Sequence, residues 1–156
     1  MPCPLHGVEY AGRVGEKVMQ IRCELIRIMI TETADHQVIV LKESDGGRVF
    51  PIVIGFFEAA AIDRRLKGHV LPRPMTHDLL ASAIEALGGR LAKVVVTDLK
   101  DHTFYATLVI ERNGDEVHVD ARPSDAIALA VAGNTPIYVE EHVLDEVAGP
   151  RSGGNA

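Results

Sequence analysis

The stretch "RPMTHDLL" (73–80) places a histidine and a carboxylate side by side at the start of a predicted helix. His77 could act as a general base or a metal ligand, with Asp78 as its partner carboxylate. The alternative is structural: Thr76 caps the helix, Asp78 complements the helix dipole, and His77 points to solvent. Adjacent helical residues point about 100° apart, so His77 and Asp78 are not expected to share one ligand.

The stretch "DARPSDAIALA" (120–130) offers groups for phosphate or metal chemistry. Arg122 could grip a phosphate through two N–H groups, and Asp120 or Asp125 could hold a divalent cation. The alternative is helix initiation, with Arg122 at the cap and Pro123 at the first helical position. The helix beyond is apolar all round, which predicts burial. Its start should therefore lie at an edge of the core.

The two halves of the chain repeat one pattern. The segment "IMITETADH" (28–36) aligns with "VVVTDLKDH" (94–102), and further along Glu58 aligns with Asp125. Each half is predicted as strand, turn, strand, turn, strand, helix, which indicates a duplicated α+β unit. Both acidic residues fall about three residues into a helix, where a carboxylate complements the dipole. Only the second half has the edge formed by Asp120, Arg122 and Ser124.

Hydrophobic periodicity and turn residues predict the strands that position these side chains. The predicted strands cover 18–30, 36–43, 48–54, 90–99, 103–111 and 116–121. The parity of the first strand flips between Leu25 and Ile26, which predicts a β-bulge. A short strand and a last helical segment are expected within 135–149.

Three helices are predicted in addition to that last segment. The segments "FFEAAAIDRRLKG" and "THDLLASAIEALGG" should end at Gly68 and Gly88, and the third helix runs to about Ala132. The second helix carries one apolar stripe, formed by Leu79, Leu80, Ala83, Ile84 and Leu87. We expect one folded domain over 18–147, between a flexible leader (1–17) and a flexible tail (148–156).

Composition narrows the function classes. The net charge of −6 opposes strong nonspecific nucleic-acid binding, and the chain has only four Phe, three Tyr and no Trp for base stacking. A basic group, interpreted as a solvated helix face, is the local exception: Arg64, Arg65, Lys67 and Arg73. The sequence shows no membrane-span pattern and no secretory signal, so the expected location is the cytoplasm without membrane contact.

Several stretches together resemble the bifunctional nuclease domain family. They are "FPIVIGFFEAAAI", "RPMTHDLL", "FYATLVIERNG", "ARPSDAIALA" and "PIYVEEHVL", in this order. The resemblance spans roughly residues 19–147. It implies an α+β domain with a mostly antiparallel, barrel-like sheet, packed helices and an internal duplication. It also implies nuclease activity, because plant members are described as acting on both RNA and DNA.

Two functions are therefore expected as alternatives. The first is hydrolysis of phosphodiester bonds in RNA or DNA, assisted by Mg²⁺ or Mn²⁺. The second is a non-enzymatic, homo-oligomeric binding or regulatory module. The candidate catalytic residues are His77, Asp78, Asp125 and Glu58; the candidate substrate-binding residues are Arg73, Thr76, Asp120, Arg122 and Ser124. The sequence does not identify metal ligands, and homo-oligomerisation is expected for either function.

Overall fold

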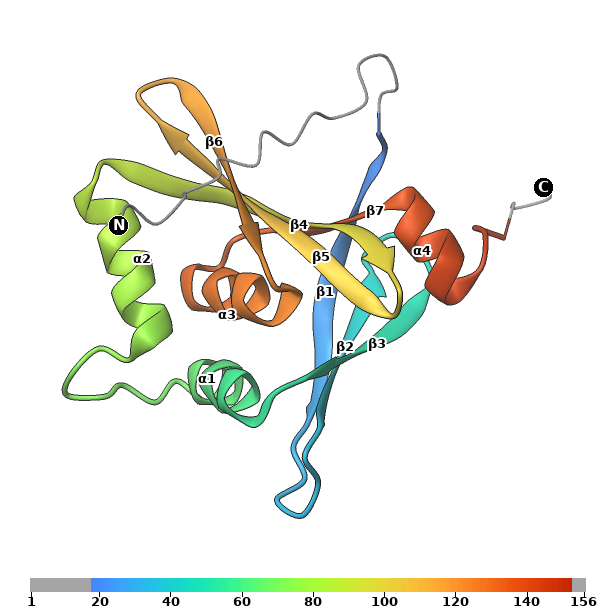
Figure 1. Ribbon diagram of the computed structural model, residues 1–156, viewed down its shortest axis with the longest axis horizontal. Coiled ribbons are helices and arrows are strands. Elements are labelled where there is room, and N and C mark those ends of the chain that lie inside the picture. The colour runs from blue at the N-terminus through green and yellow to red at the C-terminus, as the bar shows by residue number, and fades with distance from the viewer. Residues whose placement is uncertain (1–17, 153–156) are drawn as a thin grey trace, which may run out of the picture.

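The computed structural model describes residues 18–152 (Figure 1). The predicted leader, 1–17, and the last part of the predicted tail, 153–156, lie outside the described residues. The strands are β1 (Gln20–Met29), β2 (Gln37–Glu43), β3 (Val49–Ile54), β4 (Gly89–Lys100), β5 (Thr103–Arg112), β6 (Asp115–Ala121) and β7 (Ile137–Glu140). The helices are α1 (Phe56–Leu66), α2 (Thr76–Ala86), α3 (Pro123–Gly133) and α4 (Glu141–Ala148).

Alternation of apolar and polar residues forms the strands, as predicted. In β2, Ile39 and Leu41 are fully buried, while the alternate residues Val38, Val40 and Lys42 are less buried. The predicted bulge in β1 is confirmed, because the pairing with β2 shifts between Leu25 and Arg27 and leaves Ile26 as the extra residue. The turn between β5 and β6 has Asn113 and Gly114 at φ of 52° and 82°, which suits a two-residue hairpin.

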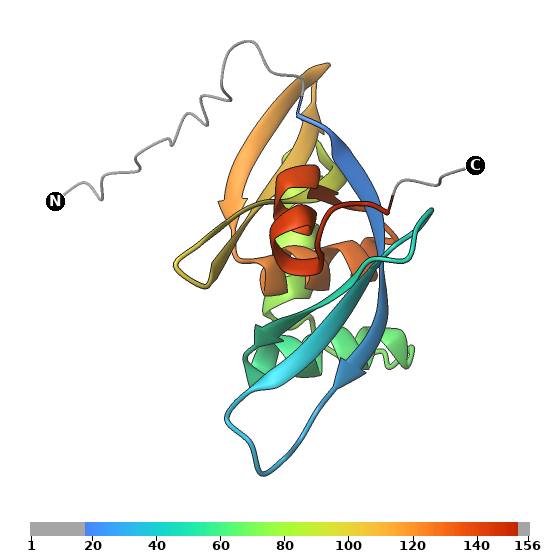
Figure 2. The ribbon, with the colours of Figure 1, turned by 90° about the vertical axis from the view of Figure 1, so that its right-hand side faces the viewer.

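The sheet has seven strands in the order β3-β2-β1-β7-β4-β5-β6. All pairs are antiparallel except β4–β7, so the prediction of a mostly antiparallel α+β fold is confirmed. Figure 2 shows how strongly the sheet twists between its two halves. The twist brings the ring of Phe50 on β3 to 6.0 Å from the ring of Phe104 on β5.

The predicted barrel-like closure is wrong. The end strands β3 and β6 do not pair, and the sheet stays open. Strand β7 enters between the two three-stranded meanders and pairs Ile137 with both Cys23 and Val94. Each meander is followed by a helix, α1 or α3, in the predicted element order. The internal duplication inferred from this order stays a prediction.

Helix α3 forms the centre of the helical layer, and α1 and α2 both pack against it (Figure 1). Its prediction as a buried helix is confirmed, because the residues from Ala126 to Ala130 are at most 3% exposed. Helix α4 packs on β3, β4 and β7 through Val143 and Leu144. Helices α1 and α2 are followed by Gly68 and Gly88 with positive φ, as predicted.

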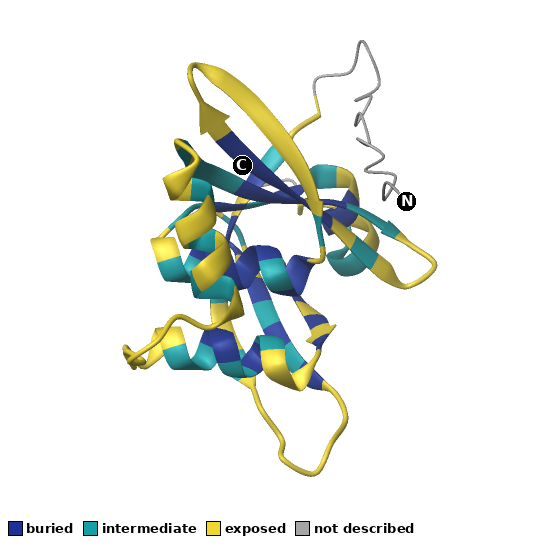
Figure 3. Cartoon of the chain, turned by 60° about the vertical axis from the view of Figure 1, so that its left-hand side comes forward, coloured by how far each residue is buried: buried dark blue, intermediate teal, exposed yellow. Residues whose placement is uncertain are grey.

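Helix α2 differs from the expectation of a helix with a core-facing stripe. Of the predicted stripe only Ile84 turns inward, and Leu79, Leu80, Ala83 and Leu87 are exposed. Figure 3 shows α2 exposed or intermediate along its whole length, beside the buried α3. The inward face is instead formed by His77, Asp78, Ala81 and Ile84. None of the helices within 18–152 is long and apolar enough to cross a membrane.

Candidate functional site

The two motifs singled out in the sequence meet in space. His77, at the start of α2, has its Nε2 atom 2.8 Å from Oδ1 of Asp125, at the start of α3. The two residues are 48 positions apart in the chain. The contact therefore depends on α2 packing against α3, and it joins the predicted base and the predicted carboxylate.

Arg122 completes this contact with two further hydrogen bonds. Its Nε donates to Oδ2 of Asp125 at 2.8 Å, and its Nη2 donates to Oε1 of Glu58 at 2.8 Å. Glu58, His77, Arg122 and Asp125 thus form one connected group, which we term the four-residue cluster. It draws its members from the first turns of α1, α2 and α3 and from the residue before α3.

Local helix geometry explains why these side chains converge. Glu58 and Asp125 each stand third in their helix, at the position where a carboxylate complements the dipole, as predicted. Arg122 is the cap residue of α3 and Pro123 follows it at the first helical position, also as predicted. Gly55 precedes α1, and a Cβ atom there would collide with the Glu58 carboxylate. The glycine leaves the space in which Glu58 reaches Arg122.

The cluster is open on the side of Arg122. The Arg122 side chain is 66% exposed, whereas those of Glu58 and His77 are 15% and 18% exposed. Partial burial of Asp125 acts to raise its pKa, but the hydrogen bonds from Arg122 and His77 outweigh burial and hold the pKa below its usual range. The hydrogen bonds to Asp125 and Glu58 raise the pKa of Arg122. Asp125 is therefore ionised near neutral pH.

Asp78 faces a different set of partners. Its Oδ2 accepts the backbone N–H of Met75 at 2.9 Å, and its Oδ1 accepts Nη2 of Arg65 at 2.5 Å. Arg64 lies 3.5 Å from the same carboxylate. The backbone hydrogen bond from Met75, together with Arg65, lowers the pKa of Asp78. The carboxylate that contacts His77 is thus Asp125 rather than the predicted partner Asp78, which fixes the start of α2.

The remaining candidate residues lie around the cluster without joining it. Thr76 is the first residue of α2, and the predicted cap role falls to Met75, because Asp78 binds the Met75 amide. Asp120 is exposed on β6 opposite Thr107. Ser124 is 6% exposed and enclosed by the core. Arg73 lines a separate hollow beside Asp78.

The part of the chain that the structure describes contains no preformed set of metal ligands. No group of three or more His, Cys, Asp or Glu side chains in 18–152 is arranged to hold one. The two carboxylates of the cluster are bridged by the guanidinium of Arg122. The donor set of the cluster, as arranged, does not fit a divalent cation.

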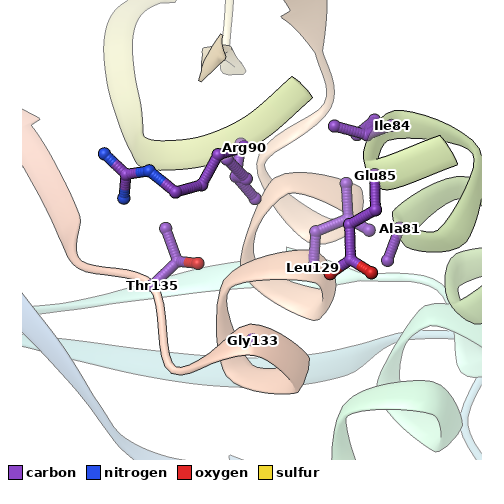
Figure 4. Close-up of a pocket in the computed structure, with 8 residues that line it drawn as sticks. Ala81, Ile84, Glu85, Arg90, Leu129, Gly133 and Thr135 are labelled. Atoms are coloured by element: carbon purple, nitrogen blue, oxygen red, sulfur yellow. The ribbon is translucent and has the colours of Figure 1, made fainter. Parts of the chain in front are cut away.

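A small cavity of about 150 Å³ lies where α2 meets α3 and β4 (Figure 4). Its wall is mainly apolar, with Ile84, Leu91 and Leu129, and Glu85 and Arg90 also line it. None of the predicted site residues lines it. The cavity lies on the inward side of α2, beside Ala81 and Ile84.

Sequence reasoning missed two ionic groups. Glu43 and Arg48 form a buried pair at 2.9 Å, to which Glu141, Asp145 and Arg151 add further contacts. The sequence pattern did indicate that Glu43 is buried, because Glu43 lies on the same face of β2 as Ile39 and Leu41. The second group is His142 between Glu140 and Asp98. No sequence pattern indicated this group, because α4 and β4 are distant in the sequence and contact each other only in the folded chain.

The family model of the bifunctional nuclease domain matches residues 39–151, from within β2 to beyond α4. The chain belongs to the bifunctional nuclease domain family. The match contains every member of the four-residue cluster. The resemblance predicted from the sequence motifs is confirmed.

Relatives of this domain come from bacteria and plants. An uncharacterized protein of Mycobacterium tuberculosis is 45% identical over 120 residues, which cover 77% of this chain and 71% of that protein. Bifunctional nuclease 2 of Arabidopsis thaliana is 30% identical over 114 residues, or 70% of this chain. Bifunctional nuclease 1 of Oryza sativa subsp. japonica is 27% identical over 120 residues, or 74% of this chain. The alignments cover 35% and 36% of these two plant proteins.

Proposed function

We propose that the chain is a nuclease that hydrolyses phosphodiester bonds of RNA, DNA or both at the four-residue cluster. The observation that carries the proposal is the 2.8 Å contact between His77 and Asp125, beside the exposed guanidinium of Arg122. Membership of the bifunctional nuclease domain family and the names of the plant relatives support the same reaction class. The cytoplasmic location expected from the sequence stays a prediction.

His77 is the proposed general base. The ionised Asp125 accepts a hydrogen bond, so the proton of a neutral His77 ring lies on Nε2, and Nδ1 keeps its lone pair. A water molecule that attacks phosphorus would lose its proton to Nδ1 while its oxygen forms the new P–O bond. The bond to the leaving alcohol then breaks, and protonated His77 returns the proton to the leaving oxygen. Asp125 stabilises the transient positive charge on the ring.

Arg122 is the proposed phosphate ligand. Its Nε and Nη2 atoms are held by Asp125 and Glu58, and this fixes the plane of the guanidinium. Nη1, which has no hydrogen bond within residues 18–152, would be available to a phosphate oxygen, and the Arg122 side chain is 66% exposed. The starts of α2 and α3 add the partial positive charge of helix N-termini. Glu58 acts as a positioning residue, since it touches Arg122.

Assistance by Mg²⁺ or Mn²⁺ is a separate part of the proposal. Glu58 and Asp125 are the carboxylates nearest to the proposed reaction, and both are engaged by Arg122. We therefore assign every step to side chains of the chain itself. Parallel assays with each cation and with EDTA test the metal-assisted form.

The test is incubation of purified protein with labelled single-stranded RNA and DNA, beside His77→Ala. Wild type should release shorter products, and the variant should be slower by about 10²–10⁴-fold, the usual contribution of a general base. Arg112→Gln, an exposed change on β5, is the matched control. Equal cleavage by wild type and a folded His77→Ala protein would exclude this site.

A homo-oligomeric binding module is a second candidate, favoured by the exposed apolar face of α2. Leu79 is 60% and Leu87 is 69% exposed, with the small residue Ala83 between them. A second copy is the occupant we propose, because a two-fold interface uses the same patch on both copies. A stable interface needs roughly 800 Å² from each partner. One helix of 11 residues does not provide this area, so further apolar residues would have to join, such as Met75, which precedes α2 and is 51% exposed.

Molecular mass in solution tests this candidate. Leu79→Glu combined with Leu87→Glu should convert an oligomer into a monomer with an unchanged circular dichroism spectrum. Val49→Glu, an exposed apolar position on β3, serves as the control. A monomeric wild type, or an oligomer that survives the double change, would exclude the α2 face as the interface.

A further inference from the structure

The hollow that Arg73 lines lies beside the four-residue cluster, where the connection between α1 and α2 folds back. Its volume is about 270 Å³. Four basic side chains and one acid line it, together with the apolar connection 70–72 and Pro74. These charged and titratable residues are Arg64, Arg65, His69, Arg73 and Asp78.

The hollow is positive in a chain whose net charge is −6. Three arginines face one carboxylate, which leaves an excess of two formal positive charges with His69 neutral. Asp78 engages Arg65 at 2.5 Å and Arg64 at 3.5 Å. Within residues 18–152, no ion pair joins Arg73 to a carboxylate. The basic group interpreted from the sequence as a solvated helix face is thus partly gathered into a concave site.

The backbone holds the connection in place. The N–H of Gly68 donates to the carbonyl of Arg65 at 3.1 Å, and the N–H of His69 donates to the carbonyl of Arg64 at 3.0 Å. With φ of 68° at Gly68, these bonds form a Schellman motif that ends α1 and reverses the chain. Pro72 and Pro74 then flank Arg73 and restrict its backbone. Because this connection is already restrained, holding the basic side chains near one another costs little conformational entropy.

The hollow and the four-residue cluster share the same two helices. His77 belongs to the cluster and the adjacent Asp78 lines the hollow. On α1, Glu58 and Arg65 are seven residues apart, which corresponds to about 10 Å along the helix. The cluster itself carries one net negative charge when His77 is neutral. A polyanionic substrate therefore needs positive charge next to the cluster, and the hollow supplies it.

We propose that this hollow binds a backbone phosphate of a single-stranded nucleic acid, next to the phosphate that lies at the four-residue cluster. The inference rests on the proposed nuclease function and specifies its substrate as a chain of several nucleotides. Arg73 is the principal ligand, with Arg64 and Arg65 beside it. The hollow is lined by no Phe, Tyr or Trp side chain, and three of its lining residues are arginines, so we assign recognition to the charge of the phosphate backbone rather than to the base sequence.

Binding to the His77→Ala protein, in which the proposed reaction is slowed, tests the inference separately from the reaction, and the following changes are made in this background. The probe is a fluorescein-labelled single-stranded oligonucleotide of about ten nucleotides, followed by anisotropy at several salt concentrations. Arg73→Gln should weaken binding by about three- to tenfold and lower the slope of log K against log salt by about 0.7, the value for one phosphate contact. Arg73→Lys should recover most of the salt slope, because the charge is restored.

Arg112→Gln is the matched control, because it removes the same charge from the end of β5. It should leave both affinity and salt slope close to wild type. Equal losses from Arg73→Gln and Arg112→Gln would overturn the inference, and so would the absence of oligonucleotide binding. Inorganic phosphate should compete only at far higher concentration than the oligonucleotide, and competition at similar concentrations would overturn the assignment to a nucleic acid chain. If the wild-type protein does not cleave but binding still depends on Arg73, the proposed reaction would be excluded and the phosphate site would be supported.

Discussion

Two groups of this domain each consist of an arginine paired with carboxylates, but one is buried and the other is exposed. In the group beside β2 and α4, Arg48 is 8% exposed and its partner Glu43 is 1% exposed. In the four-residue cluster, Arg122 is 66% exposed and holds Glu58 and Asp125. The guanidinium of Arg122 is therefore much more open to a ligand than that of Arg48. The burial of Arg48 suits a role in stability, and the exposure of Arg122 suits the phosphate binding that we propose for it.

The two groups also differ in what they can do with a proton. The hydrogen bond from Arg48 lowers the pKa of Glu43 to about 2, so this carboxylate keeps its charge at every ordinary pH. The group around Arg122 includes His77, an imidazole that binds Asp125 through Nε2 and has a second ring nitrogen. An imidazole with a second nitrogen suits the proton transfer that we propose, whereas the first group suits a fixed structural contact.

The largest expected effect on stability comes from Arg48→Met. Loss of this side chain leaves the buried charge of Glu43 without its main partner, which should lower the free energy of unfolding by about 3–5 kcal/mol. Arg122→Met should lower it by about 1 kcal/mol or less, because exposed ion pairs contribute little. Urea denaturation measures both values. Equal losses would contradict the distinction between the two groups.

The next effect is the response of Glu43 to acid. Its folded-state pKa of about 2 lies below the ordinary 4.5, so ionised Glu43 stabilises the fold above pH 4.5. This contribution, of order 3 kcal/mol, should be lost as the pH falls from about 4.5 to about 2. Urea titrations across this range should show a shallower decline for Glu43→Gln than for wild type. Parallel declines would contradict the lowered pKa.

A smaller effect is expected from Asp125→Ala. The carboxylate in the first turn of α3 should contribute about 0.3–1 kcal/mol to stability. A thermal melt should therefore shift down slightly, and Asp120→Ala, at an exposed position on β6, should not shift it. An unchanged melting temperature for Asp125→Ala would indicate that this residue serves function alone.

The smallest change in stability is expected from Gly55→Ala. A Cβ atom at this position displaces the flexible Glu58 carboxylate and should cost no more than about 0.5 kcal/mol, as at most surface sites. The same change removes one of the two anchors of Arg122. Cleavage should therefore slow measurably in a protein of almost normal stability. Normal cleavage would show that Glu58 does not position Arg122.

The sequence predicted most elements because local signals decided them. Alternation predicted the strands and the bulge near Ile26, and Arg122 with Pro123 predicted where α3 begins. The open edges of the sheet and the central place of the four-residue β7 were not predictable, because both depend on which strands pair with partners distant in the sequence. Local pattern does not contain this pairing.

The orientation of α2 was not predictable for a related reason. Its apolar stripe favoured a core-facing side, but contacts of His77 with Asp125 and of Asp78 with Arg65 turn another face inward. For the candidate site, residue types predicted His77, Arg122, Asp125 and Glu58, and spacing predicted the first-turn positions. Which carboxylate contacts His77 depends on packing between helices, so it required the structure.

The coupling between His77 and Asp125 tests the central claim most directly. Cleavage of single-stranded RNA and DNA is measured for wild type, His77→Ala, Asp125→Asn and the double variant, after folding is verified by circular dichroism. If the pair acts as one unit, each single change should remove most of the rate, and the double variant should be little slower than either one. Cleavage that survives both single changes, or losses that multiply independently, would contradict a catalytic role for this pair.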